Sequence, residues 1–295
     1  MNHKEFAATL TAEELAALNE TADAPGLWHL AGHLGMIVVF GGWIASGLPL
    51  WQVALVAQGI VICFLFTLEH EATHKTPFRT ERVNEWVGRF CGLMILLPFT
   101  WFRYFHLAHH RFTNIPGKDP ELEAGAKPET LGEYARFVCG LPYWWGMAWQ
   151  TVGNAMGRDP GRYIPSHAKR RVIVEARWMV GIYAILLGSL FVTPLLFWVW
   201  ILPCLVGQPF LRLYLLAEHG RCAFVANMFE NTRTTYTNRV VRFIAWNMPY
   251  HVEHHSLPQV PFHKLPELHG RMQGHHKVVS NGYREFTSEF VSDLK

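Results

Sequence analysis

The segment W-N-M-P-Y-H-V-E-H-H, residues 246–255, decides how this chain folds. It places three imidazoles, those of His251, His254 and His255, within about one turn of backbone. On an α-helix the positions i, i+3 and i+4 share a face, so the three rings can converge on one point. Pro249 precedes them and is equally compatible with a turn leading into the cluster. Such a density of imidazoles predicts a metal site.

Two more histidine clusters lie far away in the sequence. The same H-x-x-H-H spacing returns in H-L-A-H-H as His106, His109 and His110. A looser pair four residues apart, His70 and His74, lies in H-E-A-T-H. The fold has to bring the three clusters together if they serve one centre.

The composition is that of a membrane protein. Of the 295 residues 50% are hydrophobic and 12 are Trp, which soluble domains rarely show. The net charge is only +3, and the basic residues are spread out without interleaved base-stacking aromatic residues, so we expect no nucleic-acid partner. The five cysteines lack C-x-x-C spacing and are expected to be reduced structural residues. No apolar core follows the basic N-terminal residue, so we expect no cleavable signal peptide.

We predict four membrane spans, at about residues 28–48, 51–68, 178–192 and 194–211. The first two are joined by the turn Gly47-Leu48-Pro49 and the last two by Thr193-Pro194, so each pair should form a hairpin. Pro203 and Pro209 are expected to kink the fourth span.

Two other apolar segments are predicted to lie at the membrane surface. Residues 87–102 are short for a span and contain Arg89. If they crossed, the second histidine cluster would lie on the opposite membrane face from the first, so we predict an interfacial or re-entrant segment. Residues 140–156 are rich in Trp, which favours the headgroup level; ordinary core packing is the alternative.

The charge distribution predicts the orientation. Both hairpin turns are uncharged, and Lys and Arg cluster in the other segments, as in Lys169-Arg170-Arg171. By the positive-inside rule both termini and all histidine clusters are expected to be cytoplasmic. The predicted fold is thus an all-α integral membrane protein with four transmembrane helices in two hairpins, interfacial helices and a cytoplasmic histidine-rich cap. A polar arm (1–26), with a short helix capped at Thr11, and a polar tail (271–295) should flank the membrane domain (27–270).

Eight clustered histidines exceed what one metal site can use. A catalytic zinc takes about three protein ligands, so two metals fit better. His219, at the exit of the fourth span, would be a ninth ligand. Imidazole suits iron, copper and zinc alike, which leaves the element open. Neutral ligands also call for outer polar groups that orient the rings. The candidates for this supporting role are Glu71, Asp119, Asn247 and Glu253.

The remaining histidines are expected to have no metal role. His29, His33 and His167 stand alone in the sequence, where a histidine is more often a satisfied or exposed residue than a ligand. The other four are expected on the surface of the cap, at positions His263, His269, His275 and His276.

The motifs H-E-A-T-H, H-L-A-H-H and H-V-E-H-H, in this order and with four spans, resemble the membrane fatty acid desaturase superfamily, from His70 to Leu268. This resemblance implies two non-haem irons held by the histidines, with O2 as co-substrate, and the removal of hydrogen from an unactivated C–H bond. Family members have an extra histidine beside the fourth span, which supports His219. The segments N-T-R-T-T (231–235) and N-M-P-Y-H-V-E-H-H-S-L-P resemble bacterial members and imply the bacterial inner membrane.

The resemblance favours desaturation of a lipid acyl chain. Relatives on the same scaffold also hydroxylate or ketolate lipids, alkanes or carotenoids, and that alternative stays open. The polar arm is too short for a fused cytochrome-like domain, so we expect a separate electron donor, a ferredoxin or a cytochrome with its reductase.

Two other classes of function compete. H-E-A-T-H also satisfies H-E-x-x-H, the zinc metalloprotease motif, in which Glu71 would be the general base. That hypothesis leaves both H-x-x-H-H clusters unexplained. A non-enzymatic metal or haem carrier would bind metal without consuming dioxygen.

Overall fold

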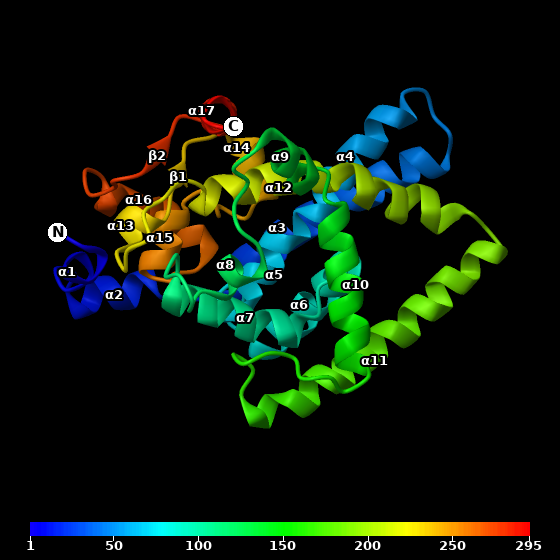
Figure 1. The fold of residues 1–295 in the computed structure, drawn as a ribbon, viewed down its shortest axis with the longest axis horizontal. Coiled ribbons are helices and arrows are strands. Elements are labelled where there is room, and N and C mark those ends of the chain that lie inside the picture. Colours follow the sequence, from blue (N-terminus) through cyan, green and yellow to red (C-terminus); the bar gives the residue numbers. More distant parts are fainter.

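The computed structural model describes residues 1–295 and is almost entirely helical (Figure 1). Its only strands, β1 and β2, pair in parallel over two residues each. In chain order the elements are α1 His3–Ala7, α2 Ala12–Leu18, α3 Asp23–Ala45, α4 Trp51–Cys63, α5 Leu65–His74, α6 Glu81–Ile95, α7 Phe99–Phe112, α8 Pro120–Ala124, α9 Leu131–Val138, α10 Leu141–Ala155, α11 Ser166–Gly188, η1 Ser189–Phe191, η2 Phe197–Ile201, α12 Leu202–His219, α13 Met228–Asn231, β1 Thr234–Thr235, α14 Arg239–Ile244, α15 His251–Ser256, η3 Phe262–Lys264, α16 Leu265–Met272, β2 Val279–Ser280 and α17 Tyr283–Ser292.

Four helical units are long and apolar enough to cross a membrane, which confirms the predicted number. They are α3 with the preceding helix, α4 with α5, α11 with η1, and η2 with α12. The third helix begins at Ser166, twelve residues before the predicted span, and the fourth continues to His219. Hydropathy marks the part of a helix that suits hydrocarbon, whereas a helix ends where its backbone hydrogen bonds end.

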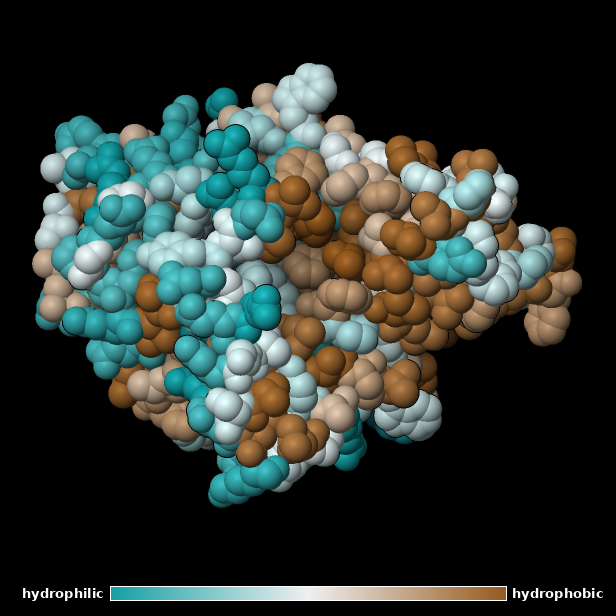
Figure 2. Space-filling model, turned by 90° about the horizontal axis from the view of Figure 1, so that it is seen from above, coloured by the Kyte–Doolittle hydropathy of each residue, from teal (hydrophilic) through white to brown (hydrophobic).

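The apolar surface is concentrated at one end of the molecule. Figure 2 shows a hydrophilic half and a half dominated by hydrophobic side chains. In the first span only 11% of the apolar window is buried, against 61% in the span Trp51–His74. The second span is therefore the inner one, and the outer helices turn their apolar faces toward lipid.

Helices α4 and α12 touch through glycines. A Cβ added to Gly59 would lie 2.1 Å from the Pro203 carbonyl oxygen, and one added to Gly207 would lie 2.1 Å from the Gly59 carbonyl group. Small residues at a membrane helix interface let two backbones approach in this way. This contact joins the two hairpins. The fourth span is irregular before its prolines: the π-helical η2 ends directly before α12, Pro203 lies in the first turn of α12, and Pro209 lies inside this continuous helix.

The segment predicted to be re-entrant is broken. Helices α6 and α7 meet at 98°, and Leu96 between them adopts a left-handed conformation with φ 59°. The carbonyl groups at the end of α6 are capped by aromatic side chains from three other helices. The donors are Tyr183 Oη to Leu93, Trp200 Nε1 to Met94 (2.8 Å) and Tyr143 Oη to Ile95 (3.1 Å). These bonds satisfy backbone groups that would otherwise be orphaned in an apolar environment.

Both chain ends pack on the histidine-rich cap. Phe6 and Leu18 of the N-terminal arm are buried in the main core. At the other end Phe286 and Phe290 of α17 pack against Leu216 and Ala217 of α12. Residues 271–295 are thus not the separate polar tail that we expected, because α17 has an apolar i, i+4 face. All five cysteines are free, as expected.

Candidate metal centre

The nine predicted histidines converge at the polar end of the spans. Helices α5, α7, α12 and α15 deliver them from four separate parts of the chain. Eight are buried and His74 is half-buried. The 98° bend between α6 and α7 returns the second cluster to the first, so the ring centroids of His70 and His106 lie 4.0 Å apart.

The histidines form two groups. In the first group the candidate ligand atoms of four side chains lie within 4.8 Å of one another, those of His70, His106, His110 and His254. His74 joins this group because its Nε2 is 2.9 Å from His106 Nε2.

The second group contains His109, His219 and His255, whose ligand atoms also lie within 4.8 Å. His251 joins it, with Nε2 3.1 Å from His219 Nε2. The rings of His110 and His255 stack at 4.0 Å and 6° where the two groups meet. The centre is therefore divided into five and four imidazoles, as two neighbouring ions would require.

The arrangement of the ring nitrogens is better explained by metal coordination than by a network of hydrogen bonds. Facing Nε2 atoms are 2.9 to 3.2 Å apart, as expected for two ligands that each lie about 2.1 Å from one ion. Nε2 of His254 and of His255, and both ring nitrogens of His110, have no hydrogen-bond partner although they are buried. Burial lowers the pKa of His254 to about 3, which keeps its imidazole neutral, the form that binds a metal.

Two of the four predicted supporting residues lie behind the ligand rings. Asp119 Oδ1 is hydrogen-bonded to Nδ1 of His109 at 2.9 Å, which fixes that ring with Nε2 turned toward the second group. Glu71 Oε1 lies 3.3 Å from Nδ1 of His254, close enough for an electrostatic contact but without a hydrogen bond between the two atoms.

Three further polar groups near the histidine rings were not predicted. Glu218 Oε1 lies 3.4 Å from His251 Nδ1, the Asn231 carbonyl oxygen 3.1 Å from His219 Nδ1, and Thr113 Oγ1 3.2 Å from His255 Nδ1. Only Glu218 carried a signal, since it directly precedes a predicted ligand. Thr113 directly follows α7 and Asn231 ends the short helix α13, and where these two residues lie relative to the rings depends on the whole fold.

The side chains of Asn247 and Glu253 make no hydrogen bond or ion pair with any of the nine histidine rings. Asn247 instead donates to the carbonyl oxygen of Phe262 at 3.0 Å. Glu253 lies two residues after His251 on a helix, about 200° around the axis, and so faces away from the ligand face. The expectation that these two residues orient the rings directly is therefore wrong.

Glu253 instead joins three segments of the cap. Its carboxylate accepts hydrogen bonds from His269 Nδ1, from His276 Nε2 (2.7 Å) and from Thr234 Oγ1 (2.6 Å). Burial raises the pKa of Glu253, but the hydrogen bonds from the two histidines outweigh it and bring the pKa to about 2. His269 and His276 are thus half-buried partners of a carboxylate, not the free surface residues that we expected. The short O···N separations are those of hydrogen bonds.

Replacing Glu253 with Gln should weaken metal binding by about 10- to 100-fold, the range typical of residues that support metal ligands. The amide cannot accept from both histidines as strongly, so α15 and its three candidate ligands lose their anchor. The metal retained after graded chelation would measure this. Glu267→Gln, at an exposed carboxylate on α16, is the control and should leave retention unchanged. Equal retention in both variants would contradict the anchoring role.

Comparison with known proteins identifies the scaffold. The family description "Fatty acid desaturase" matches residues 45–283, which include all nine histidines. The chain belongs to the fatty acid desaturase family. As a member of this family it is an oxidoreductase.

Several relatives named as desaturases are similar to this family member along most of its length. The mouse sphingolipid delta(4)-desaturase/C4-monooxygenase DES2 is 26% identical over 85% of this chain and 77% of its own. The Drosophila melanogaster sphingolipid delta(4)-desaturase DES1 is 26% identical over 83% and 74%. The sn-1 oleoyl-lipid 12-desaturase of Arthrospira platensis is 21% identical over 79% and 72%.

Proposed function

We propose that this protein is an O2-dependent diiron desaturase that introduces a double bond into the acyl chain of a lipid. The observation that carries the proposal is the division of nine converging histidines into groups of five and four in a chain of the desaturase family. Two non-haem irons would supply the dioxygen chemistry that removes hydrogen from an unactivated C–H bond. The irons would be held by His70, His74, His106, His110 and His254 in one site and by His109, His219, His251 and His255 in the other.

The surrounding residues prepare this ligand set. The carboxylates of Asp119, Glu71 and Glu218 lie on the Nδ1 side of three rings, where each would favour a proton at Nδ1 and leave Nε2 free for the ion. The buried position of the rings excludes bulk water, which protects reactive species from side reactions.

A membrane lipid is the proposed substrate, and hydroxylation is the second candidate outcome. The names of the relatives place their substrates among sphingolipids and acyl lipids. The mouse relative is named both as a desaturase and as a C4-monooxygenase, which favours hydroxylation as the alternative on this scaffold.

Electrons would come from a separate donor, a ferredoxin or a cytochrome with its reductase. We propose an inner-membrane location with the metal centre and both termini on the cytoplasmic face. The uncharged tips of both hairpins and the basic segments on the side of the cap support this orientation.

A zinc protease is a poorer explanation of the site. Glu71, which would have to be the general base, is buried and accepts hydrogen bonds from Thr76 Oγ1 (2.8 Å) and from the backbone N–H of Phe262 (3.3 Å). A base in that position does not face an open site, and six of the nine clustered histidines would have no role once zinc had its three ligands.

Expression in a host of known lipid composition, followed by mass spectrometry of lipids and pigments, should reveal a lipid that has lost two hydrogens. A product that has instead gained one oxygen would identify a hydroxylase. The same host without the gene is the control. An unchanged lipid and pigment profile, in cells whose membranes contain the iron-loaded protein and an active reductant system, would contradict both outcomes.

A further inference from the structure

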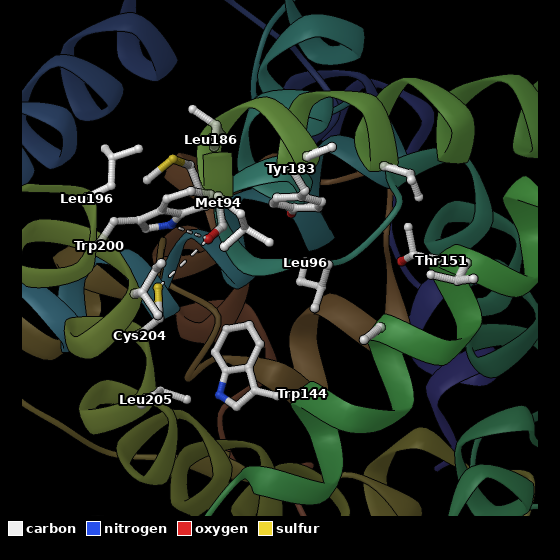
Figure 3. A pocket seen from close by; sticks show the side chains of 16 residues that line it. Met94, Leu96, Trp144, Thr151, Tyr183, Leu186, Leu196, Trp200, Cys204 and Leu205 are labelled. Atoms are coloured by element: carbon white, nitrogen blue, oxygen red, sulfur yellow. Dashed lines mark hydrogen bonds between the residues drawn. The ribbon is translucent and has the colours of Figure 1, made fainter. Parts of the chain in front are cut away.

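The two ends of the fourth span have opposite surroundings. Its beginning borders an apolar cavity of about 530 Å³ beside the re-entrant turn, where Trp200 Nε1 donates to the Met94 carbonyl oxygen (Figure 3). Its other end, where α12 carries His219, meets the buried polar segment N-T-R-T-T, residues 231–235. We call this segment the strap.

The strap is a run of five polar residues in the interior of the cap. None of the five is more than 7% exposed. Burying a polar side chain costs free energy unless the side chain is hydrogen-bonded. Because the strap adds little apolar surface to the core, its composition is explained by the hydrogen bonds that it makes.

The Asn231 carbonyl oxygen joins the ends of α7 and α12. It accepts from His219 Nδ1 at 3.1 Å and from Nδ2 of Asn114, just beyond α7, at 2.9 Å. A carbonyl oxygen can only accept, so the first contact places a proton on His219 Nδ1 and leaves Nε2 for an ion. The side chain of Asn231 fixes this carbonyl group, because its Nδ2 donates to the carbonyl oxygens of Thr113 (3.0 Å) and Val225 (2.8 Å).

Arg233 holds the last turn of α12. Its Nη1 donates to the carbonyl oxygens of Ala217 and Gly220, both at 2.7 Å. Its backbone N–H donates to the Glu218 carbonyl oxygen at 2.9 Å. The last carbonyl groups of a helix have no partner within the helix, and a cationic side chain there satisfies them. The strap therefore fixes the turn that carries His219.

Thr234 and Thr235 attach the strap to α15. The Thr234 hydroxyl donates to Glu253 at 2.6 Å and accepts from the backbone N–H of Val252 at 3.3 Å. The backbone N–H of Thr235 donates to the Pro249 carbonyl oxygen at 3.0 Å, at the entry to the same helix. The strap thus binds a third ligand-carrying helix.

The strap contacts the two histidine groups unequally. The four histidines of the second group lie on α7, α12 and α15, and the strap is hydrogen-bonded to each of these helices or to a residue adjoining it. His70 and His74 of the first group lie on α5, to which the strap makes no hydrogen bond. A weakened strap should therefore displace the ligands of the second group and leave those of α5 in place.

We propose that Asn231 is a positioning residue for the second histidine group. It fixes the ends of α7 and α12 relative to each other, so that the Nε2 atoms of His109 and His219, 3.2 Å apart, face the same ion. The inference rests on the proposed two-ion centre. It adds that the two ions are held independently and that the strap controls the occupancy of the second site alone.

Asn231→Ala tests this in the full-length protein. Without the amide the carbonyl group at position 231 loses its support, so one of the two irons should bind about 10- to 100-fold more weakly while the other is unaffected. Iron content after graded chelation measures this, and Mössbauer spectroscopy distinguishes a pair of coupled irons from a single one. Asn281→Ala, at an exposed asparagine, is the control and should keep both irons. Loss of both irons together, or of neither, would overturn the inference.

A second readout follows each histidine separately and does not require a bound ion. Exchange of the imidazole C2 hydrogen, measured by mass spectrometry, should become faster at His109 and His219 in Asn231→Ala. Exchange at His70 and His74 should stay at the wild-type rate. An equal acceleration at all four histidines would show a general loosening of the fold, and this result or no change at all would contradict the positioning role.

Asn114→Gly is the milder variant should Asn231→Ala fail to fold. Glycine keeps the left-handed backbone at position 114, where φ is 57°, and removes only the side-chain donor to the Asn231 carbonyl oxygen. Both readouts should change in the same direction as in Asn231→Ala, by a smaller factor.

The two readouts separate this inference from the proposed function. A wild type with fewer than two irons, whose Asn231→Ala variant exchanges faster at His109 and His219 only, would overturn the proposed function and support the positioning role. A wild type with two irons, whose variant keeps both irons and the wild-type exchange rates, would support the proposed function and overturn this inference.

Discussion

His254→Ala is expected to abolish product formation and to remove the metal from the first histidine group while the protein still inserts in the membrane. His254 is fully buried, with its ring centroid 4.6 Å from that of His70, and its Nε2 has no other partner. Residues that only support ligands change metal affinity by about 10- to 100-fold, so the loss of a ligand should exceed that range. The measured iron content should fall from near two ions per chain toward one.

His167→Ala is the matched control for this experiment. His167 is exposed and lies outside both histidine groups, so iron content and product should stay at wild-type levels. Retained activity in His254→Ala would contradict the ligand assignment. One zinc per chain and no iron in the wild type would instead support a metalloprotease.

Gly207→Ala is expected to lower the yield of folded protein severely. The new Cβ would lie 2.1 Å from the Gly59 carbonyl group, and backbone cannot move aside as a flexible side chain can. Such overpacking costs about 3 kcal/mol when helices cannot separate, and here α4 carries on directly into the histidines of α5. Yield and thermal unfolding in detergent would measure the loss.

The control for this change is Gly181→Ala. Gly181 also lies inside a spanning helix, but nothing approaches its added Cβ within 4 Å. Both substitutions alter helix propensity equally, so any difference reports the contact between the helices. Similar unfolding temperatures for the two variants would show that α4 and α12 can separate at little cost.

The convergence of the three histidine clusters and the number of spans could be predicted from the sequence. Histidine spacing and hydropathy depend only on residues close together in the sequence, so both can be recognised without knowing the fold. The division of the nine histidines into groups of five and four could not be predicted, because it depends on where α12 places His219 relative to α15. The supporting role predicted for Glu253 was wrong for another reason. On a helix the spacing from His251 turns Glu253 to the opposite side, but Pro249 made a helix and a turn equally compatible with the sequence, so this argument could not be applied.

Element boundaries were less predictable for a physical reason. The charged residues Lys169-Arg170-Arg171 end the hydrophobic pattern, yet the helix runs through them from Ser166 because charged side chains at a helix end can reach water. The C-terminal segment looked polar on average. Its Phe286 and Phe290 nevertheless form the apolar face that fixes α17 to the fourth span.

The three aromatic donors at the end of α6 have a consequence for biogenesis. Tyr143, Tyr183 and Trp200 all follow this turn in the chain, so its carbonyl groups have no partners when the ribosome has made only the first hairpin and α6. Moving such groups into lipid costs several kcal/mol each. We therefore expect the turn to stay near the headgroups until the second hairpin is inserted, and the histidine centre to assemble only after every span is in place.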